Sequence, residues 1–417
     1  MADGDAIEGL ERSRAKLQEY AGSRGLVLTS ESPWPGYVPA EQQTGSVRHA
    51  IWSLAGKFPG GAVGRLRHQA AFGSTLGMDV AMQHTIMVAR LPQTVGYVPM
   101  LCVRPAELMS GLYYWGGDQR PRDTQRFEST ELDRRYTVEV AKAQGQNWLW
   151  QLFSPALIDW IAHETPPDFG FKLETGVFTC ECPQWRGQGQ GRIDGEVDTE
   201  HLDVLVESSG KVASRIRDEV LEEIGTGSAS SPDSAQAYVD WVAGPKHGRI
   251  VGTILKLAGA DKPDDSVREW GSERGLEAES PATFHSRHIT LPLPGAATDV
   301  VTGTLPGTTR RGSIAWITFS SDVDMERNYV AVVGDLSGAK LPVAWVEPGE
   351  AAVPGFGADI PPAALEDAKV GGLGISTAGE AAAVILEART DMPGARVAGA
   401  EIDALIPRAV KIFDALA

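Results

Sequence analysis

The chain carries one sequence pattern twice, and this repetition constrains its fold more than any other feature. Residues 17–26 read LQEYAGSRGL, and residues 267–276 in the second half read VREWGSERGL. Further pairs of similar segments follow in the same order along the two halves: 79–82 with 322–325, 84–91 with 329–336, 99–105 with 342–348, and 202–206 with 402–406. Because the shared positions are mainly apolar and turn residues, we expect one structural framework to occur twice.

The expected helices and strands do not alternate strictly within a half, which is typical of an α+β fold with mainly antiparallel sheets. We therefore expect an internal tandem duplication, with residues 8–224 as repeat 1 and residues 264–417 as a shorter repeat 2. Residues 225–263 would form a linker and a bridging helix, because 225–236 are rich in Gly and Ser. Since duplicated modules commonly descend from homodimers, we also expect the repeats to pack as a pseudo-twofold pair.

Local patterns predict individual elements of the first half. Residues 85–91 and 97–103 have the length and flanking turn residues of two adjacent strands. Residues 170–181 predict a hairpin or a long bent strand, and Ser154 before Pro155 predicts a helix start. Apolar residues hold one face over 199–224, with a break expected at 208–210 because Ser and Gly are poor helix formers.

Repeat 1 contains a segment near residues 108–153 that has no counterpart of similar length in repeat 2. It is rich in large aromatic side chains, which often dominate the energetics of protein interfaces. Two of its tryptophans, at 148 and 150, would share one face if this stretch is a strand. These aromatic residues would form either part of an enlarged core or an exposed partner-binding surface: Tyr113, Tyr114, Trp115, Trp148 and Trp150.

Residues 127–140 read FESTELDRRYTVEV, and residues 152–161 read LFSPALIDWI. These segments resemble a bacterial family of unknown function, whose members carry F-x-S-x-x-F-x-x-x-F-x-V, then a leucine pair and T-P-A-L before a helix. The resemblance covers about residues 127–224. The chain departs from the pattern with Leu132 at the first inner aromatic position and with Phe153 and Ser154 in place of Leu-Thr. The resemblance implies an α+β module and no particular activity.

The acidic composition limits the classes of partner. The net charge is −17, and neither half has the basic face that binding to a phosphate backbone requires, so we expect no nucleic acid partner. An anionic membrane surface would repel the chain, no stretch is apolar enough to span a bilayer, and the first residues do not read as a signal peptide. Three cysteines are too few for a disulfide framework in a chain of this length. We therefore expect a cytoplasmic protein without membrane insertion.

Candidate chemical groups are sparse. Cys180 and Cys182 would face the same side of a strand, but a structural zinc site needs further Cys or His ligands nearby. His285 and His288 precede a strand-like stretch, which places them on opposite sides and favours surface or interface histidines. The glycine-rich residues 187–191 lack the Lys-Ser/Thr of a phosphate-binding loop. The sequence predicts no metal, no cofactor and no catalytic residue.

These observations favour a non-enzymatic cytoplasmic scaffold or interaction protein that binds a protein partner of unknown identity or its own copies. The alternative is a small-ligand-binding protein or an enzyme, with a pocket between the two repeats. A deep pocket with convergent ionisable groups would favour the alternative. A flat apolar patch around Trp115 and Trp148 would favour the interaction protein.

Overall fold

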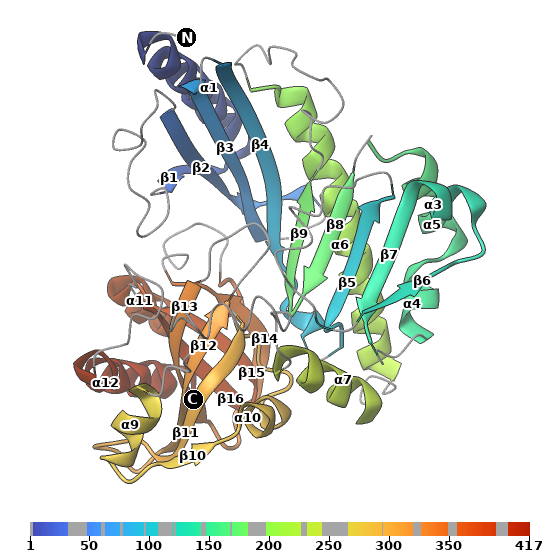
Figure 1. Ribbon diagram of the computed structural model, residues 1–417. Coiled ribbons are helices and arrows are strands. Elements are labelled where there is room, and N and C mark those ends of the chain that lie inside the picture. The colour runs from blue at the N-terminus through green and yellow to red at the C-terminus, as the bar shows by residue number, and fades with distance from the viewer. Residues whose placement is uncertain are drawn as a thin grey trace.

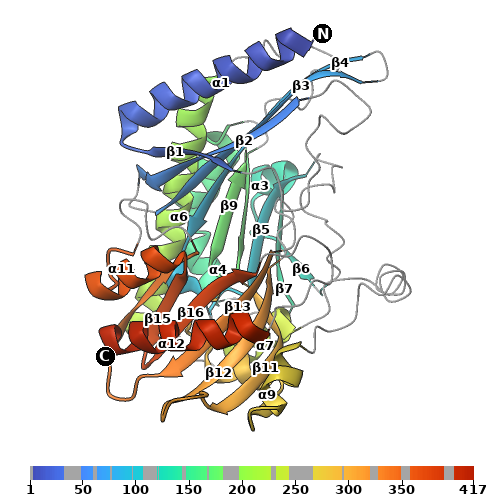
Figure 2. The ribbon, with the colours of Figure 1, turned by 90° about the vertical axis from the view of Figure 1, so that its left-hand side faces the viewer.

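The computed structural model of the chain describes residues 3–31, 48–59, 63–75, 78–95, 97–106, 120, 122–142, 147–166, 169–181, 197–226, 232–243, 266–293, 295–319, 327–348, 357–388 and 399–417. These residues form two antiparallel sheets, of nine and seven strands, with helices packed against them. Figures 1 and 2 show one sheet in each half of the chain. The expected α+β class with antiparallel sheets is confirmed. Within these residues, no helix combines the length and apolar character needed to cross a membrane.

The first half contains the larger sheet. Its elements are α1 (Asp3–Arg24), β1 (Val27–Glu31), β2 (Arg48–Lys57), β3 (Val63–Thr75), β4 (Met78–Arg90), the 3-10 helix η3 (Pro92–Thr94), β5 (Met100–Pro105), β6 (Arg122–Gln125), α3 (Thr130–Arg135), β7 (Tyr136–Ala141), α4 (Asn147–Leu152), α5 (Pro155–His163), β8 (Gly170–Glu174), β9 (Val177–Glu181) and α6 (Thr199–Thr226). The helix α7 (Pro232–Ala243) follows and reaches the second half.

The second half contains the smaller sheet. Its elements are α9 (Ser266–Ser272), β10 (Glu277–Glu279), α10 (Pro281–Arg287), β11 (Ala296–Thr304), β12 (Arg311–Phe319), β13 (Arg327–Asp335), β14 (Leu341–Val346), α11 (Pro362–Gly371), β15 (Gly374–Gly379), β16 (Ala381–Ala388) and α12 (Gly399–Leu416).

The two sheets share one strand order. The first runs β1-β2-β3-β4-β9-β8-β5-β7-β6, and the second runs β10-β11-β12-β13-β16-β15-β14. The two additional strands of the first sheet, β7 and β6, come from the segment that has no counterpart in the second half. This is the order expected if one framework occurs twice, with an elaboration in the first half.

Two predictions are wrong, one about neighbouring strands and one about the length of the linker. Strands β4 and β5 were expected side by side, but the later hairpin β8–β9 lies between them. Residues close in sequence are therefore separated by a hairpin that forms some 80 residues later in the chain. The linker is also shorter than expected, because α7 begins at Pro232 within the range 225–236. Residues 227–231 and 244–265 lie outside the described part.

The helix α6 runs without the break that was expected at residues 208–210. The Ser209 hydroxyl donates to the backbone oxygens of Leu205 and Val206, so its polar side chain is satisfied inside the helix. A Cβ atom at Gly210 would lie 2.6 Å from the backbone oxygen of Pro59. The glycine is there because another part of the chain passes close to the helix, which outweighs its poor helix propensity.

Other local predictions are confirmed. Residues 170–181, expected as a hairpin or a long bent strand, form the hairpin β8–β9. The Ser154 hydroxyl accepts a hydrogen bond from Leu157 N, with Pro155 at the first turn of α5. Here the capping signal is local, so the sequence is sufficient to place the helix start.

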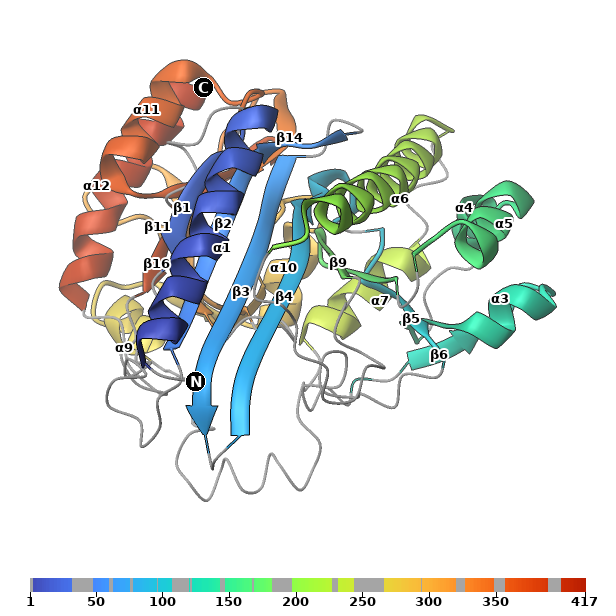
Figure 3. The same cartoon turned by 90° about the horizontal axis from the view of Figure 1, so that it is seen from above.

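The helices cover the sheets in a similar way in both halves. Seen from above, α1 lies over β1–β3, and α6 lies beside it over β4 and β9 (Figure 3). The main core of the first half lies between these helices, α5 and the sheet. In the second half, α9, α11 and α12 cover the equivalent face, and α10 packs on the opposite face. Each sheet thus buries apolar side chains between one face and a layer of helices.

An arginine clasp ties α1 to α6 in the first half. Arg24 Nη2 lies 2.5 Å from both carboxylate oxygens of Asp203, and the Tyr20 hydroxyl donates to the same carboxylate at 2.9 Å. The Arg24 guanidinium lies 3.8 Å from the centroid of the Tyr20 ring. Burial, followed by the hydrogen bond with Asp203, raises the pKa of Tyr20, which therefore stays protonated.

The same clasp ties α9 to α12 in the second half. Arg274 donates from Nε and Nη2 to Asp403 at 3.1 and 2.9 Å, and its guanidinium lies 4.6 Å from the Trp270 ring. The indole Nε1 donates to Asp403 at 3.2 Å. The repeated Arg-Gly-Leu sequence thus places an arginine at the end of α1 and two residues after the end of α9, where each reaches the last helix of its own half.

The halves meet through elements that are not equivalent. β14 of the second half lies against η3 of the first and joins a buried cluster with residues of β4 and β9. Beside it, α7 packs against α10 and β11. A pseudo-twofold pair would bring equivalent elements together, so that prediction is wrong for these contacts. The arrangement is head-to-tail.

Candidate functional site

A buried tryptophan forms the centre of the contact between the halves. Trp345, on β14, packs in one apolar cluster with Ile86, Val88 and Val177 of the first sheet. The guanidinium of Arg90 lies 4.7 Å from the centroid of the indole ring. A cation over an aromatic face is attracted to its electron density, more strongly when water is excluded. The first sheet thus holds a site that receives an aromatic side chain from another module.

A carboxylate enters the same site two residues later. Glu347 lies 2.5 Å from Arg90 and 3.7 Å from Arg65. The side chains of Arg90 and Glu347 are only 8% and 10% exposed, so the pair is largely removed from water. We name Trp345 and Glu347 the insert, and the part of the first sheet around Arg65, Val88, Arg90, Gly176 and Val177 the receptor surface.

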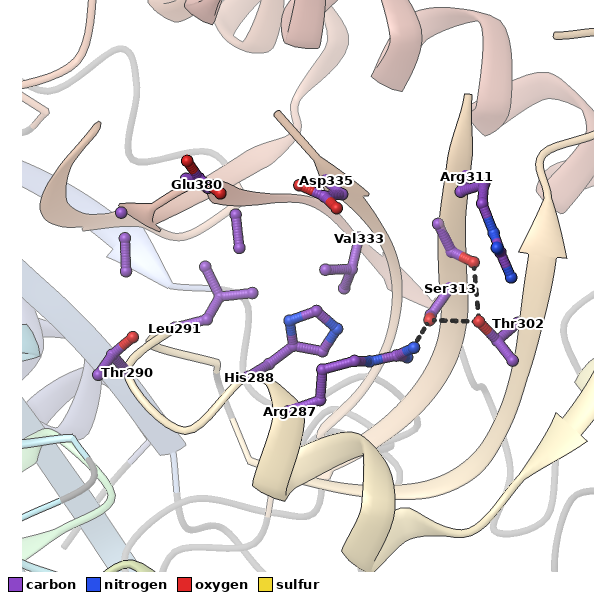
Figure 4. A pocket seen from close by; sticks show the side chains of 14 residues that line it. Arg287, His288, Thr290, Leu291, Thr302, Arg311, Ser313, Val333, Asp335 and Glu380 are labelled. Atoms are coloured by element: carbon purple, nitrogen blue, oxygen red, sulfur yellow. Dashed lines mark hydrogen bonds between the residues drawn. The ribbon is translucent and has the colours of Figure 1, made fainter. Parts of the chain in front are cut away.

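The second sheet has a cavity of about 490 Å³ on one face. Its roof is formed by the C-terminal end of α10 and the residues that follow it, and its floor by the strand ends of the sheet. Figure 4 shows His288 and Leu291 in the roof, with Arg287 and Ser313 on one side and Asp335 and Glu380 on the other. We name this cavity the sheet-2 pocket.

An arginine is held at one end of the sheet-2 pocket. Arg287 Nη2 donates to Glu279 Oε2 at 2.6 Å and to Ser313 Oγ at 2.7 Å. The Ser313 hydroxyl donates in turn to Thr302 Oγ1 at 3.3 Å. Burial raises the pKa of Glu279, and the nearby Arg287 opposes that shift. The arginine charge is thus largely compensated by its own partner, and Arg311 lies on the same side of the pocket (Figure 4).

Two exposed carboxylates form the opposite end. Asp335 ends β13, and Glu380 lies in the turn between β15 and β16. The Glu380 carboxylate accepts a hydrogen bond from Gly338 N at 3.1 Å, and Asp335 accepts one from the Ser337 hydroxyl at 3.3 Å. Both side chains remain open to water and to a ligand.

The two histidines near the sheet-2 pocket are more buried than the sequence suggested. His285 is 2% exposed, lies on the helix α10, and accepts a hydrogen bond at Nε2 from Ala297 N at 2.9 Å. Burial lowers its pKa to about 4. Burial also lowers the pKa of His288 to about 4, helped by Arg287 and opposed by Asp335. His285 is therefore not a surface histidine: it lies on α10 with its ring 6.5 Å from the Tyr238 ring of α7, and the strand expected at 289–293 is a turn.

Strand pairing makes the sheet-2 pocket the counterpart of the receptor surface. In the first sheet Arg90 pairs with Val177, and in the second Asp335 pairs with Ala381 at the same place in the strand order. Likewise, Arg65 pairs with Val88, as Ser313 pairs with Val333. The hairpin turns between β8 and β9 and between β15 and β16 place Gly176 and Glu380 at equivalent positions.

The receptor surface of the first sheet is thus occupied by the insert, whereas the equivalent surface of the second sheet forms the sheet-2 pocket. Four residues of the receptor surface contact the insert, through the apolar cluster, the ion pairs or the ring contact. At Gly176, an added Cβ atom would lie 3.7 Å from the Trp345 ring. The equivalents of these residues line the sheet-2 pocket: Ser313, Val333, Asp335, Glu380 and Ala381.

The aromatic residues predicted to form a partner surface are not assembled by the described structure. Tyr113, Tyr114 and Trp115 lie outside the described residues. Trp148 and Trp150 lie on the helix α4 and not on a strand, so the condition for a shared face is not met. Trp150 is 50% exposed, with its ring 5.2 Å from Phe127.

The cysteines and glycines offer no assembled site in the described structure. Cys180 is buried, Cys182 and residues 187–191 lie outside the described residues, and burial raises the pKa of Cys102 to about 12. No group of three or more His, Cys, Asp or Glu side chains in the described residues is placed to hold a metal ion.

Sequence reasoning missed the sheet-2 pocket, although one signal pointed to it. The matched segments 84–91 and 329–336 align Arg90 with Asp335, a reversal of charge at one position of a shared framework. Arg287 and Glu380 gave no such signal, because their positions depend on a helix and a turn whose places in the fold were not predicted.

Comparison with known proteins found no match: no protein-family model, no curated protein and no solved structure corresponds to this chain. The resemblance of residues 127–224 to a bacterial family of unknown function stays a prediction.

Proposed function

We propose that the two halves arose by internal tandem duplication and that the chain is an interaction protein. Its second half would receive a segment of a partner polypeptide in the sheet-2 pocket. One observation carries this proposal: the equivalent surface of the first sheet is occupied by a polypeptide segment, the insert of β14. A framework that binds such a segment in one copy is suited to bind one in the other.

The duplication is supported by more than the strand order. The pairing registers of β4 with β9 and of β13 with β16 correspond residue by residue. Those of β5 with β8 and of β14 with β15 correspond over 101–103 and 344–346, and differ next to the turn, where the second pair has a register shift. The clasp of arginine, aromatic ring and aspartate recurs between the first and last helices of each half. Independent origins would have no reason to repeat side-chain pairs at matching positions.

A selection from a random peptide library tests the proposed function. The intact chain is immobilised, and the control is the variant Ala381→Phe, in which a larger side chain on the floor fills the sheet-2 pocket. We expect peptides that bind the wild-type chain and not the variant, whose folding is checked by circular dichroism. If both proteins enrich the same peptides, or neither enriches any, the proposal fails.

A small polar molecule is the second candidate ligand, and it corresponds to the alternative of a ligand-binding protein. The volume of about 490 Å³ is of the size that small-molecule sites commonly have. The pocket lies within the second half, whereas the sequence suggested one between the repeats. A thermal-shift screen of small zwitterions on the wild-type chain and on Ala381→Phe distinguishes this candidate from a polypeptide.

A further inference from the structure

We infer that the sheet-2 pocket selects a partner segment with an apolar or aromatic side chain followed, two residues later, by lysine or arginine. The inference rests on the proposed function and adds the chemistry of the partner. It follows from comparing the pocket with the receptor surface, where the chemistry of the bound segment is known.

The spacing of the segment comes from the insert. Trp345 and Glu347 are two positions apart at the end of a strand, so both side chains project to the same side. The indole packs on Val88 and Val177, and the carboxylate reaches the guanidinium of Arg90. The receptor surface therefore binds one apolar side chain and one charged side chain, which are two residues apart on an extended chain.

The apolar part of this surface is retained in the second sheet. Val333 stands where Val88 stands, and Ala381 stands where Val177 stands. The smaller alanine leaves space, and the buried side chains of Val333 and Leu291 border that space. An aliphatic or aromatic side chain would bury its surface here, which stabilises binding by about 25 cal/mol per Å² of apolar area removed from water.

The charged part is reversed. Asp335 replaces Arg90, Ser313 replaces Arg65, and Glu380 replaces Gly176. Two cations and a glycine thus become two carboxylates and a hydroxyl. A segment with a carboxylate at the position of Glu347 would meet Asp335 and be repelled, while a cation would be attracted.

The other charges of the pocket leave this preference in place. Arg287 is engaged by Glu279 at 2.6 Å, and His288, with its pKa lowered to about 4, is neutral at pH 7. Arg311 lies across the pocket from Glu380 (Figure 4), but it follows the register of Gly312 with Gly334 and so lies beside Asp335. Asp335 and Glu380 together still exceed it by one negative charge. The carboxylate end therefore faces the entering residue with a net negative charge.

Two matched peptides test the inference on the intact chain. One is the chain's own segment 342–348, PVAWVEP, and the other carries the change Glu347→Lys within the peptide; both are labelled with a fluorophore at the N-terminus. Fluorescence anisotropy is measured with the wild-type chain, with Ala381→Phe and with Asp335→Arg. The last variant restores the arginine of the receptor surface at an exposed position, so it is expected to fold.

We expect the lysine peptide to bind the wild-type chain at least tenfold more tightly than the glutamate peptide, and Ala381→Phe to abolish binding of both. Asp335→Arg should invert the preference. Equal affinities, or a preference for glutamate in the wild-type chain, would overturn the inference and leave the proposed function standing. If the library selection also gives no pocket-dependent peptide, the proposed function fails with it. Pocket-dependent library peptides without a basic residue would overturn the inference alone.

Discussion

The ion pair between Arg90 and Glu347 should hold the two halves together to a measurable degree. Two unit charges about 4 Å apart attract by about 4 kcal/mol at an effective dielectric constant of about 20. The two side chains are 8% and 10% exposed, so solvent screens the pair little. Part of the attraction is offset by the cost of removing both charges from water. We expect a coupling free energy of about 2–3 kcal/mol.

A double-mutant cycle measures this coupling. The variants are Arg90→Met, Glu347→Gln and the double variant, with free energies of unfolding from urea denaturation followed by circular dichroism. The loss of the cation over Trp345 enters one single variant and the double variant alike, so it cancels in the cycle. The exposed pair Glu8 and Arg12 of α1 is the control, with an expected coupling below about 0.5 kcal/mol. A coupling for Arg90 and Glu347 as small as that of the control would refute the reasoning.

Three further outcomes follow from the packing and the pKa shifts. Gly210→Ala should lower the free energy of unfolding by about 1–3 kcal/mol, because the new Cβ atom would lie 2.6 Å from the backbone oxygen of Pro59. Gly22 has open space around it, so Gly22→Ala should raise the free energy of unfolding by about 0.5–1 kcal/mol. Urea denaturation of the two variants measures both changes. Burial lowers the pKa of His285 from 6.5 to about 4, so its neutral form is favoured in the folded chain, and stability should be full above pH 6.5 and fall as the pH drops toward 4. The loss of stability at low pH should be smaller in His285→Gln. If the pH dependence of stability is unchanged in that variant, His285 is not the group responsible. Asp403→Ala should lower the free energy of unfolding by about 1 kcal/mol, because it breaks the half-exposed clasp with Arg274. Asp203→Ala should lower it by a similar amount, and thermal denaturation measures both.

The sequence was most informative where structure depends on local chemistry or on the repeated framework. The start of α5 followed from Ser154 and Pro155, and residues 170–181, predicted as a hairpin or a long bent strand, form the hairpin β8–β9. The matched segments 84–91 and 329–336 occupy equivalent strands with equivalent registers. These features are set by residues near each other in the chain, or by a pattern present twice.

The remaining features depend on contacts between distant residues, which a single sequence does not display. Gly210 lies within an unbroken helix because Pro59 passes close to it. The hairpin β8–β9 separates β4 from β5, so neighbours in sequence are not neighbours in the sheet. The matched segments 99–105 and 342–348 align Trp345 with Cys102, and only the structure shows that Trp345 enters the other half. The pocket of the second half was missed for the same reason.

The additional strands of the first sheet have a consequence for assembly. A head-to-tail contact has no natural end, because each unit offers the same pair of complementary surfaces to the next. In the first half, the counterparts of the insert are Cys102 and Arg104. Cys102 belongs to a buried cluster with residues of α7, and Arg104 is paired with Glu139 of β7 at 3.3 Å. β7 and α7 therefore cover, in the first half, the two positions that correspond to the insert of the second half.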